Sequence, residues 1–322
     1  MTKAINQQST YRPSINHALT ISHRIEYAAV VVIFWFFKRL GLDASSALAG
    51  KFCRSVGPRL KKISSRATEN IAASFPSWSP AEVHAVMCDA WENLGRTAAE
   101  YAHLEEIFRD GSRRIEVIGV ENLERAASDG HPIIFCGIHM GNWELQTYFQ
   151  QLSDIRYKFV YRPVNNPLID KLIFDRRDEI MHGEQIPKST RASRGLIEAL
   201  REGGGLGLIV DQKLNSGVSA PLLGRMAKTA ATPARLALKF DAAMLPIHVQ
   251  RRRGAYFRLV IGAPLPVKDS GDVEKDVHAL TCEMNDALSE IIRNNPSDWL
   301  WFHRRWAKPT RSNTAEFTAD TE

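Results

Sequence analysis

The sequence predicts an α/β fold, a largely parallel layered sheet flanked by helices, with an N-terminal membrane-anchoring helix in front of it. Two observations predict the sheet. Short apolar runs typical of buried strands recur between residues 114 and 261, and segments with helical spacing of apolar residues separate most of them. The anchor is predicted by an uncharged apolar stretch at residues 28–37. A chain of 322 residues is long enough for one large domain of this kind.

The apolar stretch reads AAVVVIFWFF and is followed by Lys38 and Arg39. A helix that crosses a bilayer needs roughly 20 apolar residues, so this stretch alone is short for a span. Its aromatic residues favour an interfacial or single-pass anchor, and a buried helix of a soluble domain is the alternative. Basic residues are more frequent after the stretch than before it, which would place the rest of the chain on the cytoplasmic side. The predicted division is a polar lead (1–23), an anchor region (24–60), a main domain (61–311) and a disordered tail (312–322).

Beyond the anchor region, the first clear element is a helix that begins near residue 79. Ser79 is a suitable N-cap, Pro80 occupies the first turn, and Glu82 completes a capping box. Strands are predicted at 114–119, 132–138, 157–161, 206–210, 244–250 and 256–261. Helices are predicted at 120–128, 141–152, 167–181, 193–202, 232–240 and 273–294. In an open α/β sheet, catalytic residues are expected at the carboxyl ends of the strands.

The charge balance is basic, with a net charge of +6 and a pI near 9.2. Such an excess suits an anionic partner, which could be nucleic acid, a phosphorylated glycolipid, an acidic carrier protein or an anionic membrane surface. The four cysteines lie too far apart for a CxxC metal or redox motif, and Cys136 falls in an apolar run typical of a buried strand. Nothing indicates a disulfide framework, so a reducing compartment is favoured.

The strongest local signal is the segment IIFCGIHMGNWE at residues 133–144. His139 directly follows a buried strand, and Glu144 falls in the first turn of the next predicted helix. This His-x4-Glu spacing lets the carboxylate fold back toward the imidazole, as in a general base whose partner fixes its tautomer. The alternative is a structural histidine beside an unrelated glutamate. The spacing is not that of a zinc motif, so neither a metal nor a cofactor is predicted.

Polar side chains also follow two further predicted strands, 157–161 and 206–210. Because the carboxyl ends of parallel strands meet at one edge, these side chains are expected near His139. The candidate substrate-binding residues at the two strand ends are Arg162, Asn165, Asn166, Asp211, Gln212 and Lys213.

The C-terminal segment WLWFHRRW, residues 299–306, alternates large aromatic residues with His303, Arg304 and Arg305. Aromatic and arginine side chains suit an interface or a sugar-phosphate ligand, so the two arginines are further candidates for substrate binding. A structural aromatic cluster is the alternative. Base stacking is conceivable, but no nucleic-acid-binding signature accompanies the segment.

Taken in order, the motifs resemble the bacterial lipid A late acyltransferases, the lauroyl and myristoyl transferases within the wider glycerolipid acyltransferase superfamily. The resemblance covers roughly residues 24–309. It is carried by GIHMGNWE, YRPVNNPLID at 161–170, IPKSTRASRGLIEAL at 186–200, LGLIVDQK at 206–213 and NPSDWLWFHRRW at 295–306. Asn70, Ile71, Phe75 and Pro76 match a further segment of the family. The segment PLLG at 221–224 departs from it, because the family more often has aromatic residues before the glycine, and this difference is expected to affect the acyl-chain or acceptor pocket.

The resemblance implies transfer of a fatty acyl group from acyl carrier protein to a hydroxyl of a glycolipid, a lipid A precursor, at the cytoplasmic face of the inner membrane. His139 would deprotonate the acceptor hydroxyl, and Glu144 would orient His139 and stabilise its charged form. Arg162 would bind a phosphate or an oxyanion, and Asp211 would position the acceptor or the base.

Two alternatives remain open at the level of sequence. The acceptor could be another lipid, such as a lysophospholipid, an ornithine lipid or a phosphoinositide mannoside. From a different class, the chain could be a non-catalytic membrane- or nucleic-acid-binding module that uses its basic surface alone.

Overall fold

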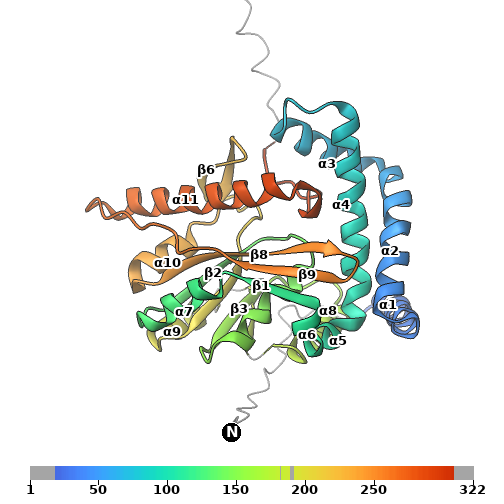
Figure 1. Ribbon diagram of the computed structural model, residues 1–322, viewed down its shortest axis with the longest axis horizontal. Coiled ribbons are helices and arrows are strands. Elements are labelled where there is room, and N and C mark those ends of the chain that lie inside the picture. The colour runs from blue at the N-terminus through green and yellow to red at the C-terminus, as the bar shows by residue number, and fades with distance from the viewer. Residues whose placement is uncertain (1–18, 182, 189–191, 308–322) are drawn as a thin grey trace, which may run out of the picture.

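The computed structural model describes residues 19–181, 183–188 and 192–307. In these residues a seven-stranded sheet is flanked by helices on both faces, and a group of N-terminal helices stands at one end of it (Figure 1). The predicted α/β fold with a mostly parallel sheet is confirmed. Residues 1–18 of the predicted lead and the whole of the predicted tail lie outside the described residues.

The N-terminal third is helical. Four α-helices lead into the sheet domain: α1 (Ile21–Leu40), α2 (Leu42–Val56), α3 (Lys61–Ser74) and α4 (Pro80–Glu100), with the short 3-10 helix η1 (Gly57–Arg59) before α3. The capping box predicted for α4 is present, with Ser79 and Glu82 bonding each other's backbone N–H groups. Helix α2 packs along α4, and α1 lies beside it at the edge of the molecule (Figure 1). Across the described ranges, no helix combines the length and the apolar character that a membrane crossing requires.

The remaining elements alternate much as predicted. The strands are β1 (Ile115–Ile118), β2 (Ile133–Gly137), β3 (Tyr157–Tyr161), β4 (Glu184–Pro187), β5 (Gly205–Ile209), β6 (Val218–Leu222), β7 (Arg225–Thr229), β8 (Ala243–Arg253) and β9 (Tyr256–Ile261). The helices are η2 (Tyr101–His103), α5 (Leu104–Arg109), α6 (Gly111–Arg114), α7 (Val120–Ser128), η3 (Trp143–Leu152), α8 (Pro167–Asp178), α9 (Ala192–Arg201), α10 (Thr232–Phe240), α11 (Val273–Asn294) and η4 (Pro296–Asp298).

The main sheet has the strand order β1-β9-β8-β2-β5-β3-β4. From β8 to β4 all neighbours are parallel, whereas β9 runs antiparallel to β8 and β1 runs parallel to β9. The five strands β2, β3, β4, β5 and β8 therefore end at one edge. Strands β6 and β7 form a separate antiparallel hairpin.

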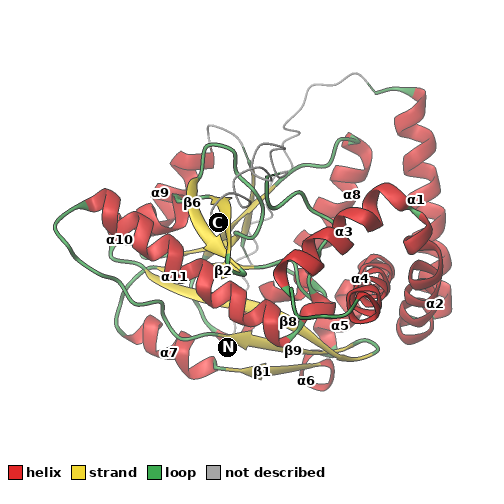
Figure 2. Cartoon of the chain, turned by 90° about the horizontal axis from the view of Figure 1, so that it is seen from above, coloured by secondary structure: helices red, strands yellow, loops and turns green. Residues whose placement is uncertain are grey.

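Strand β2 lies at the centre of the sheet and is buried on both faces, as its uninterrupted apolar run indicates. Ile134 and Cys136 face a core built with α9, α10 and α11, and Figure 2 shows α11 lying across this face. Ile133 and Phe135 face a second core built with α5, α7 and η3. Because residues of both faces are fixed by packing, the end of β2 is a rigid base for the residues that follow it.

Three features differ from the sequence expectation. The segment after His139 is a 3-10 helix, η3, rather than an α-helix. Strand β4, at one edge of the main sheet, was not predicted. The β6–β7 hairpin, which lies outside the main sheet, was not predicted either. The hairpin turn contains Leu223 at φ 52° and Gly224 at φ 75°. A leucine with positive φ is not a turn signal, so the sequence pattern gave no indication of this hairpin.

Candidate active site

The sheet topology brings the predicted site residues to one edge. Gly137 of β2 pairs with Ile209 of β5 in the sheet. His139 and Asp211 each lie two residues further along their chains, so they leave the sheet at the same level. Arg162 directly follows β3, the next strand beyond β5. The predicted convergence at the carboxyl ends of β2, β5 and β3 is therefore confirmed at the level of the sheet.

The buried carboxylate of Asp211 is bonded to His139 by two contacts. His139 Nδ1 lies 2.7 Å from Oδ1, and the backbone N–H of His139 donates to Oδ2 over 3.0 Å. Trp299 Nε1 donates to the same Oδ2 over 2.8 Å. Burial alone would raise the pKa of Asp211, but the imidazole beside it and these hydrogen bonds outweigh burial and hold that pKa below its usual range. Asp211 is thus an ionised acceptor at neutral pH.

The partner of Nδ1 determines the tautomer of His139. An ionised carboxylate only accepts hydrogen bonds, so Nδ1 carries the hydrogen and Nε2 keeps its lone pair. No described residue forms a hydrogen bond with Nε2. The His139 side chain is 15% exposed, and the rings of Trp143 and His303 flank it with centroids 5.3 and 5.4 Å away. Nε2 is therefore available as a proton acceptor.

Glu144 does not make the contact that the sequence predicted. Its carboxylate accepts from Arg177 Nε and Nη2, both over 2.7 Å, and from the Tyr101 hydroxyl. Burial would raise the pKa of Glu144, but the charge of Arg177 and the hydrogen bonds from Arg177 and Tyr101 hold it below its usual range. His139 adds only a weaker electrostatic effect. The hydrogen-bonded partner of His139 is Asp211 rather than Glu144.

A tight turn separates His139 from η3. Gly141 has φ +56°, and a Cβ there would lie 2.4 Å from the carbonyl oxygen of Val249, so a side chain fits neither the conformation nor the space. Asn142 caps η3 by accepting from the Glu144 backbone N–H over 3.2 Å. The turn therefore connects His139 to η3 within four residues.

The other predicted residues of the β3 and β5 ends differ in their contacts. Arg162, Asn165, Gln212 and Lys213 are exposed at the sheet edge. Gln212 Nε2 lies 3.5 Å from His303 Nε2, close to the site. Asn166 is buried; it caps α8 and donates to His23 and Glu26 of α1. Its amide thus serves a structural purpose, and the substrate-binding roles of this group stay predictions.

The two arginines of the C-terminal segment are placed differently from one another. Arg304 is exposed, whereas Arg305 is only 1% exposed and donates to Lys228 O and Thr229 Oγ1. The aromatic cluster expected as the alternative is present: Trp299 stacks edge-on with Trp301 and Trp306. This segment supports the site through Trp299 and His303, which the sequence reading did not single out.

Arg177 and Tyr101 also escaped the sequence reading, because they are distant in sequence from Glu144 and carry no local motif. Burial lowers the pKa of His303, and the electrostatic effect of the neighbouring His139 lowers it further. In the described part of the chain, no group of three His, Cys, Asp or Glu side chains is arranged to hold a metal ion.

A histidine with a free Nε2, held by a buried carboxylate at the carboxyl edge of an α/β sheet, is an arrangement that suits general-base catalysis. The chain belongs to the bacterial lipid A biosynthesis acyltransferase family, whose model matches residues 16–308. It is therefore an enzyme that transfers acyl groups.

Three relatives illustrate the range of the family. The lipid A biosynthesis palmitoleoyltransferase of Escherichia coli K12 is 24% identical over 280 residues, which cover 85% of this chain and 88% of the relative. The lauroyltransferase of the same organism is 26% identical over 265 residues, or 80% and 82% of the two chains. The phosphatidylinositol mannoside acyltransferase of Mycobacterium tuberculosis H37Rv is 25% identical over 268 residues, 79% of each chain.

Proposed function

We propose that the protein is an O-acyltransferase that moves a fatty acyl chain from acyl carrier protein to a hydroxyl of a lipid A precursor. The observation that carries the chemistry is the His139–Asp211 pair, with Nε2 of the histidine free. The basic balance of the chain, net +6, suits both an acidic carrier and a phosphorylated acceptor.

In this mechanism His139 Nε2 takes the proton of the acceptor hydroxyl while the oxygen attacks the thioester carbon. The tetrahedral intermediate collapses, the C–S bond breaks, and the carrier thiolate takes the proton back from the imidazolium. Asp211 holds the ring and stabilises the imidazolium between the two steps. Glu144, predicted as the partner of the histidine, would instead hold the η3 side of the site through Arg177.

The general-base role is tested by His139→Ala. Removing a general base costs roughly 10²- to 10⁴-fold, so we expect kcat for acyl transfer to fall by at least about 100-fold with normal folding. Purified variant and wild type would be compared by release of free thiol from an acyl carrier protein thioester. A loss smaller than about tenfold in a folded variant would contradict this role.

The acceptor is the second part of the proposal. Lipid A acyltransferases are among the relatives, which favours a lipid A precursor. A phosphatidylinositol mannoside acyltransferase is similar to nearly the same degree, so another lipid acceptor is the second candidate. The assay would offer acyl carrier protein thioesters with a tetra-acylated lipid A precursor, a lysophospholipid, an ornithine lipid precursor or a phosphatidylinositol mannoside. Acylation of only one of the last three would replace our first choice.

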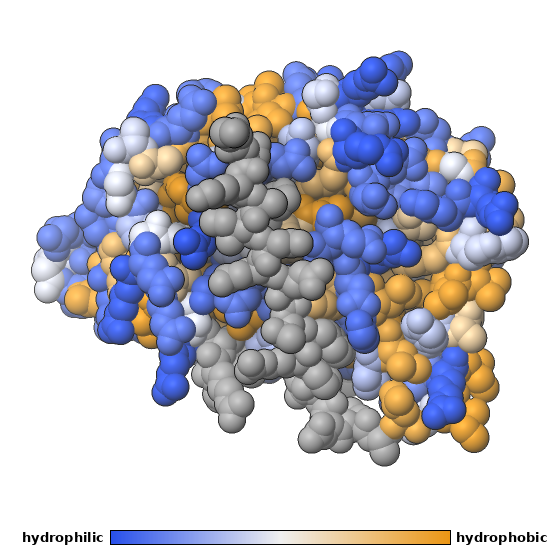
Figure 3. Space-filling view, turned by 90° about the horizontal axis from the view of Figure 1, so that it is seen from below, coloured by the Kyte–Doolittle hydropathy of each residue, from blue (hydrophilic) through white to orange (hydrophobic). Residues whose placement is uncertain are grey.

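We further propose that α1 and α2 attach the enzyme to the cytoplasmic face of the inner membrane by lying in the interface. Large apolar side chains are exposed along both helices, and Figure 3 shows apolar residues gathered at the end of the molecule that these helices form. They include Ile21, Ile25, Val32, Trp35, Phe36, Leu48, Phe52 and Val56. Basic residues of the same segment, among them Lys38, Arg39 and Lys51, suit anionic lipid headgroups.

Co-sedimentation with lipid vesicles tests the attachment. We expect wild-type protein to bind phosphatidylglycerol-containing vesicles and the Trp35→Glu/Phe52→Glu variant to bind at least about tenfold more weakly, because both side chains are about 60% exposed and would have to enter the acyl boundary. Val273→Glu, an equally exposed apolar position at the start of α11, is the matched control. Equal binding by all three proteins would contradict the attachment.

A further inference from the structure

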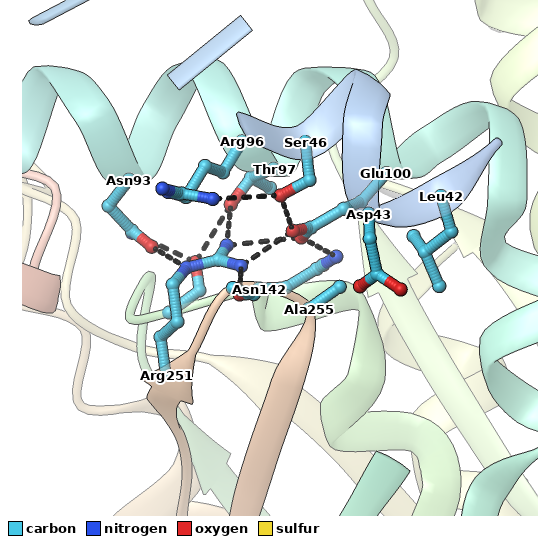
Figure 4. A network of polar contacts seen from close by, with 12 residues as sticks. Leu42, Asp43, Ser46, Asn93, Arg96, Thr97, Glu100, Asn142, Arg251 and Ala255 are labelled. Carbon is cyan, nitrogen blue, oxygen red and sulfur yellow. Dashed lines mark hydrogen bonds and ion pairs between the residues drawn. The ribbon is translucent and has the colours of Figure 1, made fainter. Parts of the chain in front are cut away.

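A buried polar cluster lies directly behind the turn that follows His139. It consists of Asn93, Thr97 and Glu100 of α4, Asn142 of the turn and Arg251 of β8, and we name it the turn network (Figure 4). Arg251 stands near the carboxyl end of β8, the parallel neighbour of β2, so it lies at the same sheet edge as His139. The proposed mechanism uses none of these residues.

The ion pair at the centre of the turn network is fully satisfied. Glu100 and Arg251 have side chains that are 0% and 8% exposed. Glu100 accepts two bonds from Arg251 over 2.5 and 3.0 Å, one from Ser46 over 2.7 Å and one from Asn142 over 2.9 Å. Arg251 uses every N–H of its guanidinium, donating also to Asn93, Thr97 and the Gly254 carbonyl.

The outer members of the network hold the turn itself. Asn93 Nδ2 and Thr97 Oγ1 both donate to the carbonyl of Gly141 over 3.0 Å. Asn93 Nδ2 also donates to the carbonyl of Asp298, which accepts the Gly141 N–H over 3.0 Å. Together with the Asn142–Glu100 bond, these contacts fix Gly141 and Asn142, the two residues that lie immediately before η3.

Arg251 also contacts the segment that holds Asp211, the partner of His139. Arg251 N donates to Asp298 Oδ2 over 2.9 Å, and the residue after Asp298 is Trp299, which bonds Asp211. The backbone of His139 accepts from Leu300 N–H over 3.0 Å. The turn network therefore sets the positions of the His139 turn and of the Trp299 segment relative to one another.

A buried ion pair is not needed for stability alone, because replacing one with apolar residues of similar volume is often neutral or stabilising. What an apolar pair cannot replace is the amide and carbonyl bonding that fixes the turn. We infer that Glu100 and Arg251 are positioning residues for His139, holding the 140–142 turn so that the imidazole stays aligned with Asp211. This inference rests on the proposed acyl transfer and extends it to residues that do not touch the substrate.

The first test uses Glu100→Gln, which keeps the shape of the side chain and removes its charge. It leaves Arg251 buried without a counter-ion, so both the stability and kcat are expected to fall, kcat by about 10- to 100-fold, since a displacement of about 1 Å costs on the order of 10² in rate. The KM values should change by less than about threefold, because substrate contacts remain. A general loss of folded protein would lower kcat as well, so a second variant is required.

The Glu100→Leu/Arg251→Met double variant separates stability from positioning. It removes both charges, so its thermal midpoint should lie above that of Glu100→Gln, in which Arg251 stays buried without a counter-ion. Its kcat should stay at least about tenfold low, because Asn93 and Thr97 no longer accept from Arg251 and Asn142 no longer donates to Glu100. The acidic limb of its pH–kcat profile should move to lower pH, because the imidazolium loses part of its stabilisation by Asp211. A merely structural role would leave that limb in place.

Thr97→Val tests the same inference in a variant that keeps the ion pair. It removes one donor to the Gly141 carbonyl and should lower kcat about three- to tenfold at unchanged KM, the scale expected for a small displacement of the histidine. The control is Glu116→Leu/Arg258→Met, which removes an ion pair of 2.9 Å between β1 and β9 and should keep wild-type kcat.

A folded double variant with wild-type kcat, or Thr97→Val with wild-type kcat should the double variant not fold, would overturn the inference. Inactive wild-type protein would instead overturn the proposed function.

Discussion

Asp211 is the residue on which the tautomer of His139 depends. Asp211→Asn preserves the shape of the side chain and an acceptor for Trp299, but it removes the charge that favours the imidazolium. We expect kcat to fall by about 10³- to 10⁴-fold with little change in KM, the scale seen when the carboxylate of a catalytic triad becomes an amide. Steady-state kinetics with an acyl carrier protein thioester measure both constants.

Glu144→Gln is the comparison for that variant, since Glu144 was the partner that the sequence predicted. If Asp211 is the working partner, Glu144→Gln loses less activity than Asp211→Asn. The reverse order, in two variants with equal thermal midpoints, would restore Glu144 as the partner and contradict our assignment.

His248 of β8 gives the fold a pH dependence of its own. Its side chain is buried, and burial lowers its pKa to about 4, whereas an unfolded histidine titrates near 6.5. Between these values the unfolded state binds a proton that the folded state does not, so stability falls as the pH falls from about 6.5 to about 4. At pH 5 the loss is about 2 kcal/mol.

His248→Gln should remove that loss. Urea unfolding at pH 7.5 and pH 5.0 gives the free energy of unfolding at both values, and the decrease should be about 2 kcal/mol smaller in the variant than in wild type. Equal decreases would show that His248 does not take up this proton on unfolding. His131→Gln, an exposed histidine, is the control.

Between elements, the Glu144–Arg177 pair joins η3 to α8. Glu144 is 6% exposed in its side chain and Arg177 is 20% exposed, so neither charge is well solvated. Arg177→Met leaves the Glu144 carboxylate buried with only Tyr101 as partner and should lower the free energy of unfolding by about 3–5 kcal/mol. The double variant Arg177→Met/Glu144→Leu should recover most of that loss. Chemical denaturation of both variants checks the prediction.

Some of these elements could be predicted from the sequence, and others could not. The ends of β2 and β5 were predictable, because buried apolar runs identify strands and parallel strands place His139 and Asp211 at one edge. The choice between Asp211 and Glu144 could not be predicted. It depends on the pairing of Gly137 with Ile209, which places His139 beside Asp211, and on Arg177, which binds Glu144 from 33 residues away. Local spacing favoured the nearer carboxylate. Tertiary contacts selected the distant one.

At the scale of the molecule, the sequence pattern also did not predict the turn network or most of the N-terminal helices. Asn93, Thr97 and Glu100 occupy the face of α4 that α2 and the sheet edge cover, and a polar residue on a helix usually indicates a solvent-facing position. The apolar stretch at 28–37, by contrast, was found correctly as part of a helix, α1, with no residue of that helix buried. Its function as an anchor stays a prediction.

The net charge of +6 supplies a final prediction, which concerns the acyl donor. An acidic carrier protein is attracted over a long range by a basic enzyme, and salt screens that attraction because the Debye length falls to about 8 Å at 0.15 M ionic strength. The KM for an acyl carrier protein thioester should therefore rise several-fold when the salt concentration is raised from about 0.02 M to about 0.3 M. The KM for an uncharged acyl-pantetheine thioester should stay constant, since it carries no charge to screen. Both are measured in neutral detergent micelles, which remove the contribution of anionic lipid. An equal response of the two donors would show that the enzyme does not recognise its donor through the charge of a carrier protein.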